Sequence, residues 1–274
     1  MISTNDTCVY DEVIVPHLQR MINLESLTLY LSVEGQGKFI DGSNLTRNIL
    51  SHMPHLNQFL FNIRSIVSFD NQLQLPSNDK IQQSFRNCTD YEVVSYVDYF
   101  PSNKKGQCCV YTYPSTMLDF DGLTNSFPGG SFKYVRCAHL FDERPFEHTF
   151  FLRIAQAFPS LEFLSITNFE PQIRKDDQDN NNSNEYLPII EYSHLDVLDL
   201  FDAHDDYAEQ FLLHTRTCFS NPIHLSLHYG TIQRVTHNFT RDATRVNCEM
   251  VKSFLMTDRT NVPEHFNLYF PRVK

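Results

Sequence analysis

The chain has 274 residues, of which 41% are hydrophobic and 13% aromatic, and its net charge is −11 at neutral pH. This composition predicts a folded protein with a sizeable core and excludes an intrinsically disordered chain. The acidic balance argues against nucleic acid or an anionic membrane surface as the partner. There is no membrane-length apolar run and no secretory signal at the N-terminus, so we expect a cytoplasmic or nuclear protein with reduced cysteines.

A six-residue pattern recurs along the chain: apolar, two variable residues, apolar, one variable residue, apolar. Its copies begin at seven anchor residues, Leu24, Leu56, Val135, Leu161, Leu195, Pro222 and Val251. The step of 79 residues from Leu56 to Val135 has room for two further degenerate copies, and the other steps are 26 to 34 residues. The last three positions alternate as a short strand requires. Repeats of about 20 to 29 residues with this strand signature are typical of leucine-rich repeats.

Amphipathic segments precede several of the copies. The first is predicted to start at the cap residue Ser43 and end at Pro54, and two more helices are predicted at 147–158 and 207–219. A repeated helix–strand order favours parallel strands on one side and helices on the other. We therefore predict an α/β protein: a solenoid of irregular helix–strand repeats, similar to leucine-rich repeats, as one domain over residues 1–274.

Two segments do not follow the repeat. Residues 93–99 and 107–113 read as two strands around the turn 101–106, which predicts an inserted β-hairpin at 93–113. Residues 170–184 are polar, rich in Asn and Asp and almost without apolar side chains. That composition predicts a disordered loop inserted between two strand copies.

Several stretches resemble the repeat-bearing region of F-box/leucine-rich-repeat proteins of the large, diverged invertebrate F-box-type sets. They are VPHLQRMINLESLTL, LSHMPHLNQFLF, FLRIAQAFPSLEFLSI and IIEYSHLDVLDL, and the resemblance extends over residues 13–270. It implies that the repeats present a protein substrate to a cullin-based (SCF) ubiquitin ligase. Skp1 and a cullin would then be partners only if an F-box segment lies upstream.

The chain departs from that family in two ways. The first repeat starts near Val13 without a preceding F-box, so we expect either a fragment or a paralogue that lost the segment. The Asn or Cys expected eight residues after each anchor is also missing, and with it the side-chain ladder that satisfies the backbone of the turns. Those positions hold Ser32, Arg64, Glu143, Phe169, Ala203, Gly230 and Arg259.

In such a sheet, the side chains that flank the inward apolar positions form a concave face. The candidate partner-binding residues on it are Thr28, Tyr30, Asn62, Phe163, Ser165, Thr167, Asp199, Phe201, Ser226 and His228. The aromatic side chains Tyr30, Phe163 and Phe201 either anchor a partner or pack beneath neighbouring loops. A slip of one residue in register would move every one of these side chains to the other face.

No motif for catalysis or nucleotide binding occurs. The residues Cys137-Ala138-His139 and His204-Asp205-Asp206 are weak metal candidates; the first reads as an ordinary strand, and the second as capping and dipole partners at a helix start. We expect no catalytic residue, cofactor or metal. The expected function is a protein-interaction module, the substrate-recognition part of an F-box-type ligase component. The alternative is a free-standing scaffold without a ligase link.

Overall fold

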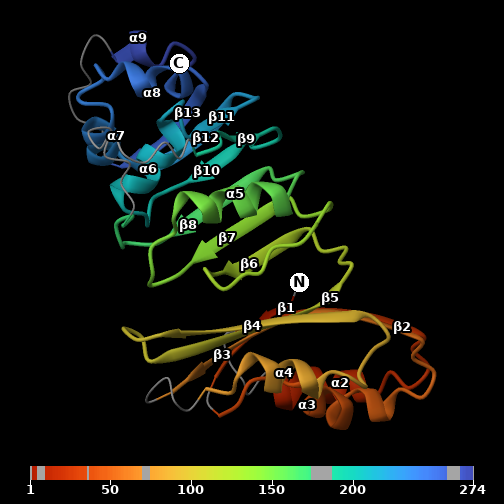
Figure 1. The fold of residues 1–274 in the computed structure, drawn as a ribbon. Helices are drawn as coiled ribbons and strands as arrows, with labels where there is room; N and C mark the ends of the chain where they lie inside the picture. Colours follow the sequence, from red (N-terminus) through yellow and green to blue (C-terminus); the bar gives the residue numbers. More distant parts are fainter. Residues whose placement is uncertain are drawn as a thin grey trace. The chain divides into compact units, whose positions relative to one another are not determined.

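A computed structural model of the chain describes residues 2–4, 10–35, 37–69, 75–173, 187–257 and 266–273. The fold is α/β, with mixed sheets that include parallel strands (Figure 1). The chain divides into two compact units. Unit 1 comprises residues 1–117 and 126–128, and unit 2 comprises residues 118–125 and 129–274. One repeat domain was expected over this length. Of the predicted loop 170–184, residues 174–184 lie outside the described residues.

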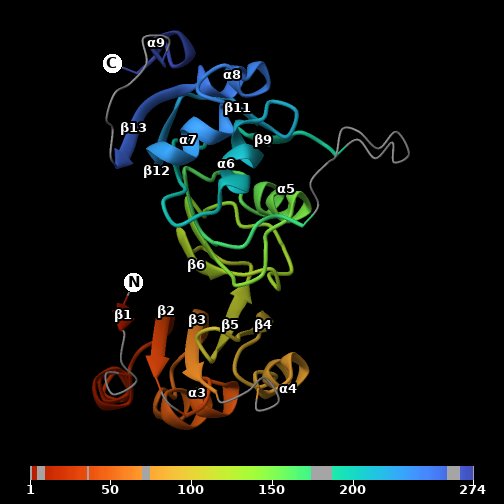
Figure 2. The same ribbon diagram turned by 90° about the vertical axis from the view of Figure 1, so that its left-hand side faces the viewer.

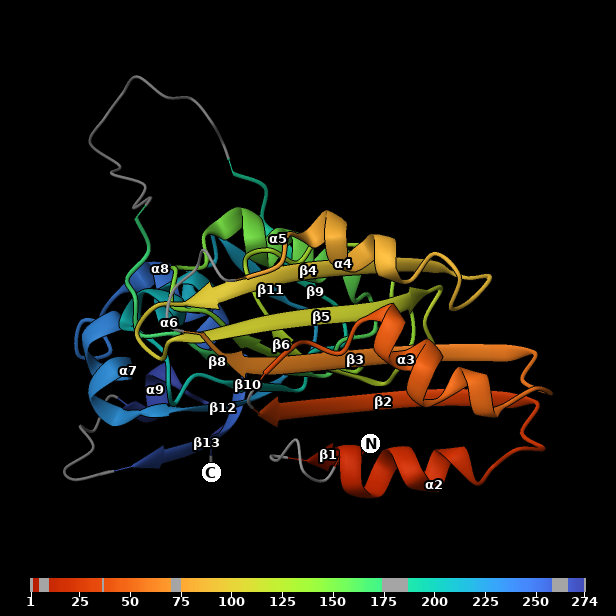
Figure 3. The ribbon, with the colours of Figure 1, turned by 90° about the horizontal axis from the view of Figure 1, so that it is seen from below.

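Unit 1 is built on a five-stranded sheet with the order β1-β2-β3-β5-β4. Its elements are β1 (Ile2–Thr4), the π-helical turn η1 (Tyr10–Ile14), α2 (Val15–Gln19), β2 (Ser26–Gly35), α3 (Gly42–Asn48), the 3₁₀ turn η2 (Leu50–His52), β3 (Gln58–Ser68), α4 (Asn78–Ser84), β4 (Glu92–Phe100) and β5 (Lys105–Tyr113). Strands β1, β2 and β3 run parallel, whereas β5 runs antiparallel to β3 and β4. Helices α2, α3 and α4 lie on one face of the sheet (Figures 1 and 3).

The predicted hairpin is confirmed by the pairing of β4 with β5. Glu92 lies opposite Tyr113 at one end, and Phe100 lies opposite Lys105 at the turn. The hairpin is a full part of the sheet, because β5 also pairs with β3, where Val110 lies opposite Ile63. Unit 1 thus combines parallel strands with an antiparallel pair, which a repeat of helix–strand units alone does not produce.

Helix α3 shows the predicted buried face but a different start and an earlier end, because it stops at Asn48 and the 3₁₀ turn η2 follows. Leu45 and Ile49 are fully buried, as their spacing predicts. The cap is Asp41, whose carboxylate accepts a hydrogen bond from the backbone N–H of Asn44 at 2.8 Å, so the prediction of Ser43 as the cap was wrong by two residues. Gly42 begins the helix where it touches α4, because a Cβ at this position would lie 2.1 Å from the carbonyl oxygen of Ser84.

Unit 2 is built on a six-stranded, all-parallel sheet with the order β13-β12-β10-β8-β7-β6, beside a two-stranded parallel sheet of β11 and β9. Its elements are β6 (Asp119–Leu123), β7 (Cys137–Phe141), α5 (His148–Ala157), β8 (Phe163–Thr167), β9 (Ile190–Tyr192), β10 (Val197–Asp199), α6 (Asp205–Leu212), β11 (Thr217–Phe219), β12 (Ile223–His228), α7 (Tyr229–Val235), α8 (Asp242–Cys248), β13 (Val251–Thr257) and α9 (Phe266–Tyr269). In the large sheet, the spatial order of the strands is the same as their order along the chain; β9 and β11 are not part of this sheet.

The core of unit 2 lies between the large sheet and its helices. Leu164, Leu198 and Leu225 point inward from successive strands and are fully buried. Figure 2 shows α5 and α6 on one side of the strands. From these helices, Phe151 and Phe211 meet edge to face with ring centroids 5.2 Å apart. Edge-to-face rings pack well and add attraction beyond their buried area, which explains how a chain without tryptophan fills this core.

Helix α5 confirms the predicted helix at 147–158, but α6 is shorter than the predicted 207–219. It ends at Leu212, and residues 217–219 form β11 instead, paired with β9. The amide of Asn247 donates to the carbonyl oxygens of Phe211 at 3.0 Å and Thr217 at 2.7 Å. These bonds from α8 satisfy the carbonyl of Phe211, which a longer helix would have used internally, and the carbonyl of Thr217 in β11.

A buried polar side chain follows each of the strands β7 and β8. Asp142 is 1% exposed and accepts hydrogen bonds from the backbone N–H groups of Asn125 at 2.8 Å and Arg144 at 2.9 Å. Asn168 donates to the carbonyl oxygen of Arg144 at 2.7 Å and accepts from the N–H of Glu170 at 2.9 Å. Each therefore satisfies backbone groups in successive turns.

These two side chains correct the expectation that turn-satisfying residues are missing. They stand seven residues after the anchors Val135 and Leu161, one position earlier than expected. Seven residues after Leu24 and Leu56 the chain instead has Leu31 and Ile63, which are buried within the long strands β2 and β3. The turn after a short strand is thus a feature of unit 2, although the six-residue pattern occurs in both units.

Candidate functional site

The candidate partner-binding residues lie on two different sheets. Thr28, Tyr30 and Asn62 belong to β2 and β3 of unit 1. The other seven belong to unit 2: Phe163, Ser165, Thr167, Asp199, Phe201, Ser226 and His228. They were expected on one continuous concave face. Since the two sheets belong to separate compact units, we take the larger set, on the six-stranded sheet, as the candidate site.

The predicted register of this sheet is confirmed. Leu164 and Leu198 are fully buried, whereas Phe163, Ser165 and Asp199 on the opposite face are half-buried. Pairing places Ser165 opposite both His139 and Asp199. Ser226 is the exception on this face, because it is only 8% exposed.

We call the outward side of this sheet the unit 2 face. It comprises Asp119, Asp121, Cys137, His139, Phe141, Phe163, Ser165, Thr167, Val197, Asp199, Phe201, His224, Ser226, His228, Ser253 and Leu255. On β7, β8 and β10 these positions alternate with buried ones, as the pleat of a sheet requires. The set is a mixture of aromatic, imidazole, hydroxyl and carboxylate groups.

Two aromatic rings of the unit 2 face each lie beside an imidazole from the neighbouring strand. The rings of Phe163 and His139 have centroids 5.3 Å apart, and those of Phe201 and His228 have centroids 5.4 Å apart. Both phenylalanines remain half-exposed in these pairs. At unit 1, Tyr30 is also half-exposed, and its hydroxyl lies 3.3 Å from that of Thr116.

Asp119 has the most unusual surroundings on the unit 2 face. Among the described residues its Oδ1 atom, which is buried, has no hydrogen-bond partner, and the Nε2 atom of His139 lies 3.9 Å away. Burial raises the pKa of this carboxyl above its usual range, while the neighbouring His139 opposes the rise. The Asp119 side chain as a whole is 36% exposed, so its carboxylate is only partly removed from solvent.

Sequence reasoning missed Asp119 and treated His139 only as a weak metal candidate. The omission of Asp119 follows from β6, which no copy of the pattern predicted because it lies in the long step between Leu56 and Val135. The alternation of Asp119, Phe120 and Asp121 was the available signal: Phe120 is fully buried and the two carboxylates point outward. Three alternating residues are too few to distinguish a strand from a turn.

The first metal candidate, Cys137 with His139, has the predicted strand geometry. Burial and the nearby carboxylates Asp119 and Glu162 raise the pKa of the Cys137 thiol. A raised pKa keeps the thiol protonated, and the thiolate is the form that binds metals or attacks substrates. Among the described residues, no group of three His, Cys, Asp or Glu side chains is placed to hold a metal ion.

The second metal candidate lies at the start of α6, where capping was expected. The Nδ1 atom of His204 accepts a hydrogen bond from the backbone N–H of Asp206 at 3.2 Å. Asp205 pairs with Arg234, and the hydrogen bond from this guanidinium lowers the pKa of the carboxyl. Asp205 and Asp206 stand in the first turn, where negative charge stabilises a helix.

Cations occur beside the unit 2 face, at the starts of its strands. Arg136, just before β7, pairs with Glu162, just before β8. Lys252, on β13, pairs with Asp196, just before β10. These pairs neutralise the two positive charges next to the face. On the face itself, the acidic residues Asp119, Asp121 and Asp199 have no lysine or arginine among them.

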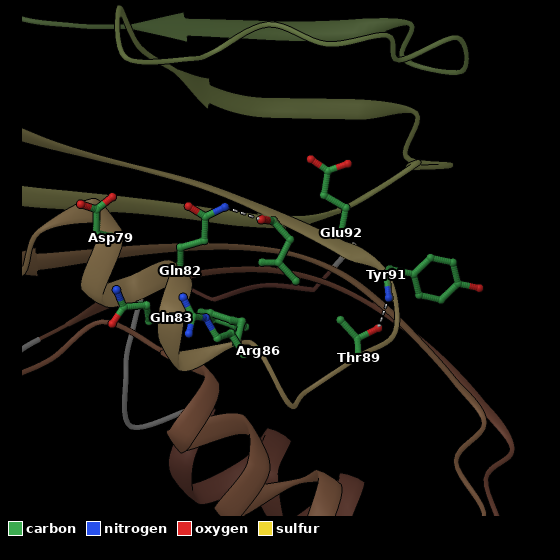
Figure 4. Close-up of a pocket in the computed structure, with 9 residues that line it drawn as sticks. Asp79, Gln82, Gln83, Arg86, Thr89, Tyr91 and Glu92 are labelled. Carbon is green, nitrogen blue, oxygen red and sulfur yellow. Dashed lines mark hydrogen bonds between the residues drawn. The ribbon is translucent and has the colours of Figure 1, made fainter.

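A separate hollow of about 390 Å³ lies in unit 1, beside α4 and the start of β4 (Figure 4). The Gln82 amide donates to the carbonyl oxygen of Val93 at 3.0 Å, and the Thr89 hydroxyl accepts from the N–H of Tyr91 at 3.3 Å. In Figure 4 the Tyr91 ring points away from the helix. Two polar side chains that line the hollow, those of Gln82 and Thr89, are therefore already hydrogen-bonded to backbone groups of its walls.

No protein-family model, curated protein or solved structure matches the chain. No helix in the described ranges is both long and apolar enough to cross a membrane. The function proposed below is therefore argued from the residues and their geometry.

Proposed function

We propose that the chain is a non-catalytic protein-binding module and that the unit 2 face is its binding surface. The observation that carries this proposal is the exposure of aromatic, imidazole and carboxylate side chains on the outward side of one rigid six-stranded sheet. Aromatic residues in a polar setting are the usual anchors of protein interfaces. The sheet is closed on its other side by helices, so its outward side is the one available to a partner.

The proposal includes a finer description of unit 2 as a solenoid similar to leucine-rich repeats. It is supported by the order of β6, β7, β8, β10, β12 and β13, which are neighbours both along the chain and in the sheet. It is also supported by Asp142 and Asn168, which satisfy the turns after β7 and β8 in the manner of a side-chain ladder. Unit 1 stands outside the repeat in this description.

We further propose that this module is the substrate-recognition part of an F-box-type (SCF) ubiquitin ligase component, acting in the cytoplasm or nucleus. The support is the resemblance of the repeat stretches to that family. The alternative is a free-standing scaffold with no ligase link. Purification of the endogenously tagged protein distinguishes the two. Skp1 and a cullin among the co-purifying proteins would support the ligase role, and stable partners without either would leave the scaffold.

The binding surface is tested by crosslinking in the native cell extract. We expect the double variant Phe163→Ala and Phe201→Ala to lose partners that wild-type protein captures, because it removes both rings from the unit 2 face. The matched control is Val246→Ala with Ile189→Ala, which removes two exposed apolar side chains elsewhere in unit 2. An unchanged set of partners in the Phe double variant would contradict the proposal.

A further inference from the structure

We propose that the unit 2 face binds an extended protein segment that carries lysine or arginine side chains and crosses the strands of the sheet. This inference rests on the proposed function, because it takes the unit 2 face as a binding surface. It adds the chemical nature of the partner and states that the partner segment runs across the strands, not along them. Four features of the face lead to it: its charge, the Asp119 carboxylate, the spacing of the carboxylates and a ring between them.

The first feature is charge. The acidic side chains on the unit 2 face are Asp119, Asp121 and Asp199, and no lysine or arginine is among the residues that form it. The nearby cations Arg136 and Lys252 are neutralised by Glu162 and Asp196. The whole chain carries a net charge of −11. A partner with basic side chains would meet complementary charge, whereas an acidic partner would be repelled.

The second feature is the partly exposed carboxylate of Asp119. Its side chain is 36% exposed, no donor among the described residues bonds its Oδ1 atom, and the Nε2 atom of His139 is 3.9 Å away, beyond hydrogen-bond distance. A lysine ammonium brings up to three donors and a full positive charge. Because part of the Asp119 side chain is exposed, such a group from a partner can approach this carboxylate and pair with its charge.

The third feature is the spacing of the carboxylates. Asp119 lies on β6 and Asp199 on β10, with β7 and β8 between them. With strands about 4.8 Å apart, the two residues are about 14 Å apart across the sheet, and their register adds about 7 Å along it. An extended segment needs about four to five residues to cover that distance. The partner would therefore carry basic residues at this spacing.

Between the two carboxylates lies Phe163, half-exposed on β8 beside His139. An aromatic face attracts cations and also packs against the methylene stems of lysine and arginine. A basic segment that crosses the strands would place such a stem or an apolar side chain over this ring. The same segment thus meets carboxylate, ring and carboxylate in that order.

The test uses the full chain and a phage-displayed library of random twelve-residue peptides. Selection on the wild-type protein is expected to enrich sequences with two lysine or arginine residues four or five positions apart. The enriched peptides should bind at least tenfold more weakly to the double variant Asp119→Asn with Asp199→Asn, and more weakly as salt is raised. The matched control, Glu25→Gln with Asp90→Asn, removes two exposed carboxylates from unit 1 and should leave binding unchanged.

Enrichment of neutral or acidic peptides, no enrichment, or equal binding to the Asn double variant would overturn the inference. Crosslinked native partners separate this failure from failure of the proposed function. If a partner crosslinks to the unit 2 face through a neutral or acidic segment, the basic-segment inference is wrong and the binding surface stands. If no partner crosslinks to this face, both are wrong.

Discussion

At the scale of single residues, Asp119 combines a cost to folding with a position on the unit 2 face. Burial raises its pKa in the folded state, so the folded protein disfavours its ionised form. The stability linked to its protonated form is fully present below the unfolded pKa of about 4 and is lost as the pH rises through the folded value. Ionisation at neutral pH therefore destabilises the fold.

This linkage predicts the effect of Asp119→Asn on thermal stability. The variant should melt at a higher temperature than wild type at pH 7, and the difference should shrink as the pH falls toward 4, because wild-type Asp119 then becomes neutral as well. Melting curves followed by circular dichroism at several pH values measure it. Asp199→Asn is the comparison, and a lower melting temperature for Asp119→Asn at pH 7 would refute the argument.

Asp142 is the opposite case, a buried carboxylate that is fully engaged. Replacing it by alanine would leave the backbone N–H groups of Asn125 and Arg144 without their acceptor in a buried turn. We expect Asp142→Ala to lower the free energy of unfolding by about 2 to 4 kcal/mol. Denaturant unfolding measures the change, and Asp142→Asn, which keeps an acceptor oxygen, should cost less. A loss below about 0.5 kcal/mol for the alanine variant would contradict this role.

At the scale of elements, the close approach of α3 and α4 makes a further prediction. A methyl group at Gly42 would overlap the backbone of Ser84, which cannot move without displacing α4. We expect Gly42→Ala to destabilise unit 1 by about 1 to 3 kcal/mol. Hydrogen exchange at α3 and α4 measures the loss. Gly37→Ala is an informative comparison, because Gly37 has open space around its Cβ position but a φ of +118°.

Strands were the elements that the sequence predicted best, because local alternation decides them. Every copy of the six-residue pattern leads into a strand, from β2 at Leu24 to β13 at Val251. What the pattern could not predict was how far each strand runs. Leu31 and Ile63 continue the alternation in unit 1, while Asp142 and Asn168 end it in unit 2. The two units share one motif, so the division between them could be seen only in three dimensions.

The same reasoning applies to the candidate site. Phe163, Ser165 and Asp199 were predicted on the outward face, because a strand's inward residues identify its outward ones. Asp119 was not predicted there, because β6 was not predicted. The ring contact of His139 with Phe163 was not predicted either, because it depends on the pairing of β7 with β8. The end of α6 was likewise decided by Asn247, which is distant in sequence. Contacts of this kind cannot be inferred from local periodicity.

At the scale of the whole molecule, residues 126–128 belong to unit 1 although unit 2 has already begun at residue 118. Phe127 is fully buried, and its ring packs edge to face with that of Tyr96 at 6.2 Å. The neighbouring Ser126 hydroxyl donates to Asp98 at 2.6 Å. Unit 1 is therefore incomplete at residue 117, and its hairpin relies on this returning segment.

Removing the Phe127 ring should then destabilise unit 1 selectively. We expect Phe127→Ala to cost about 3 to 5 kcal/mol. Amide hydrogen exchange should show lost protection in β4 and β5, with β8 and β10 preserved. Phe151→Ala, in the core of unit 2, is the matched variant and should give the reverse pattern. Equal loss in both units for either variant would mean that the units unfold together.

The sheet of unit 2 also has a consequence for how such a protein changes over generations. Each of its strands pairs only with strands that are close to it along the chain, so an in-frame duplication or deletion of one helix–strand segment leaves the other pairings intact. The row of outward side chains would grow or shrink by one strand at a time. Related genes could thus acquire new binding preferences by copying short stretches of coding sequence, without redesigning the core.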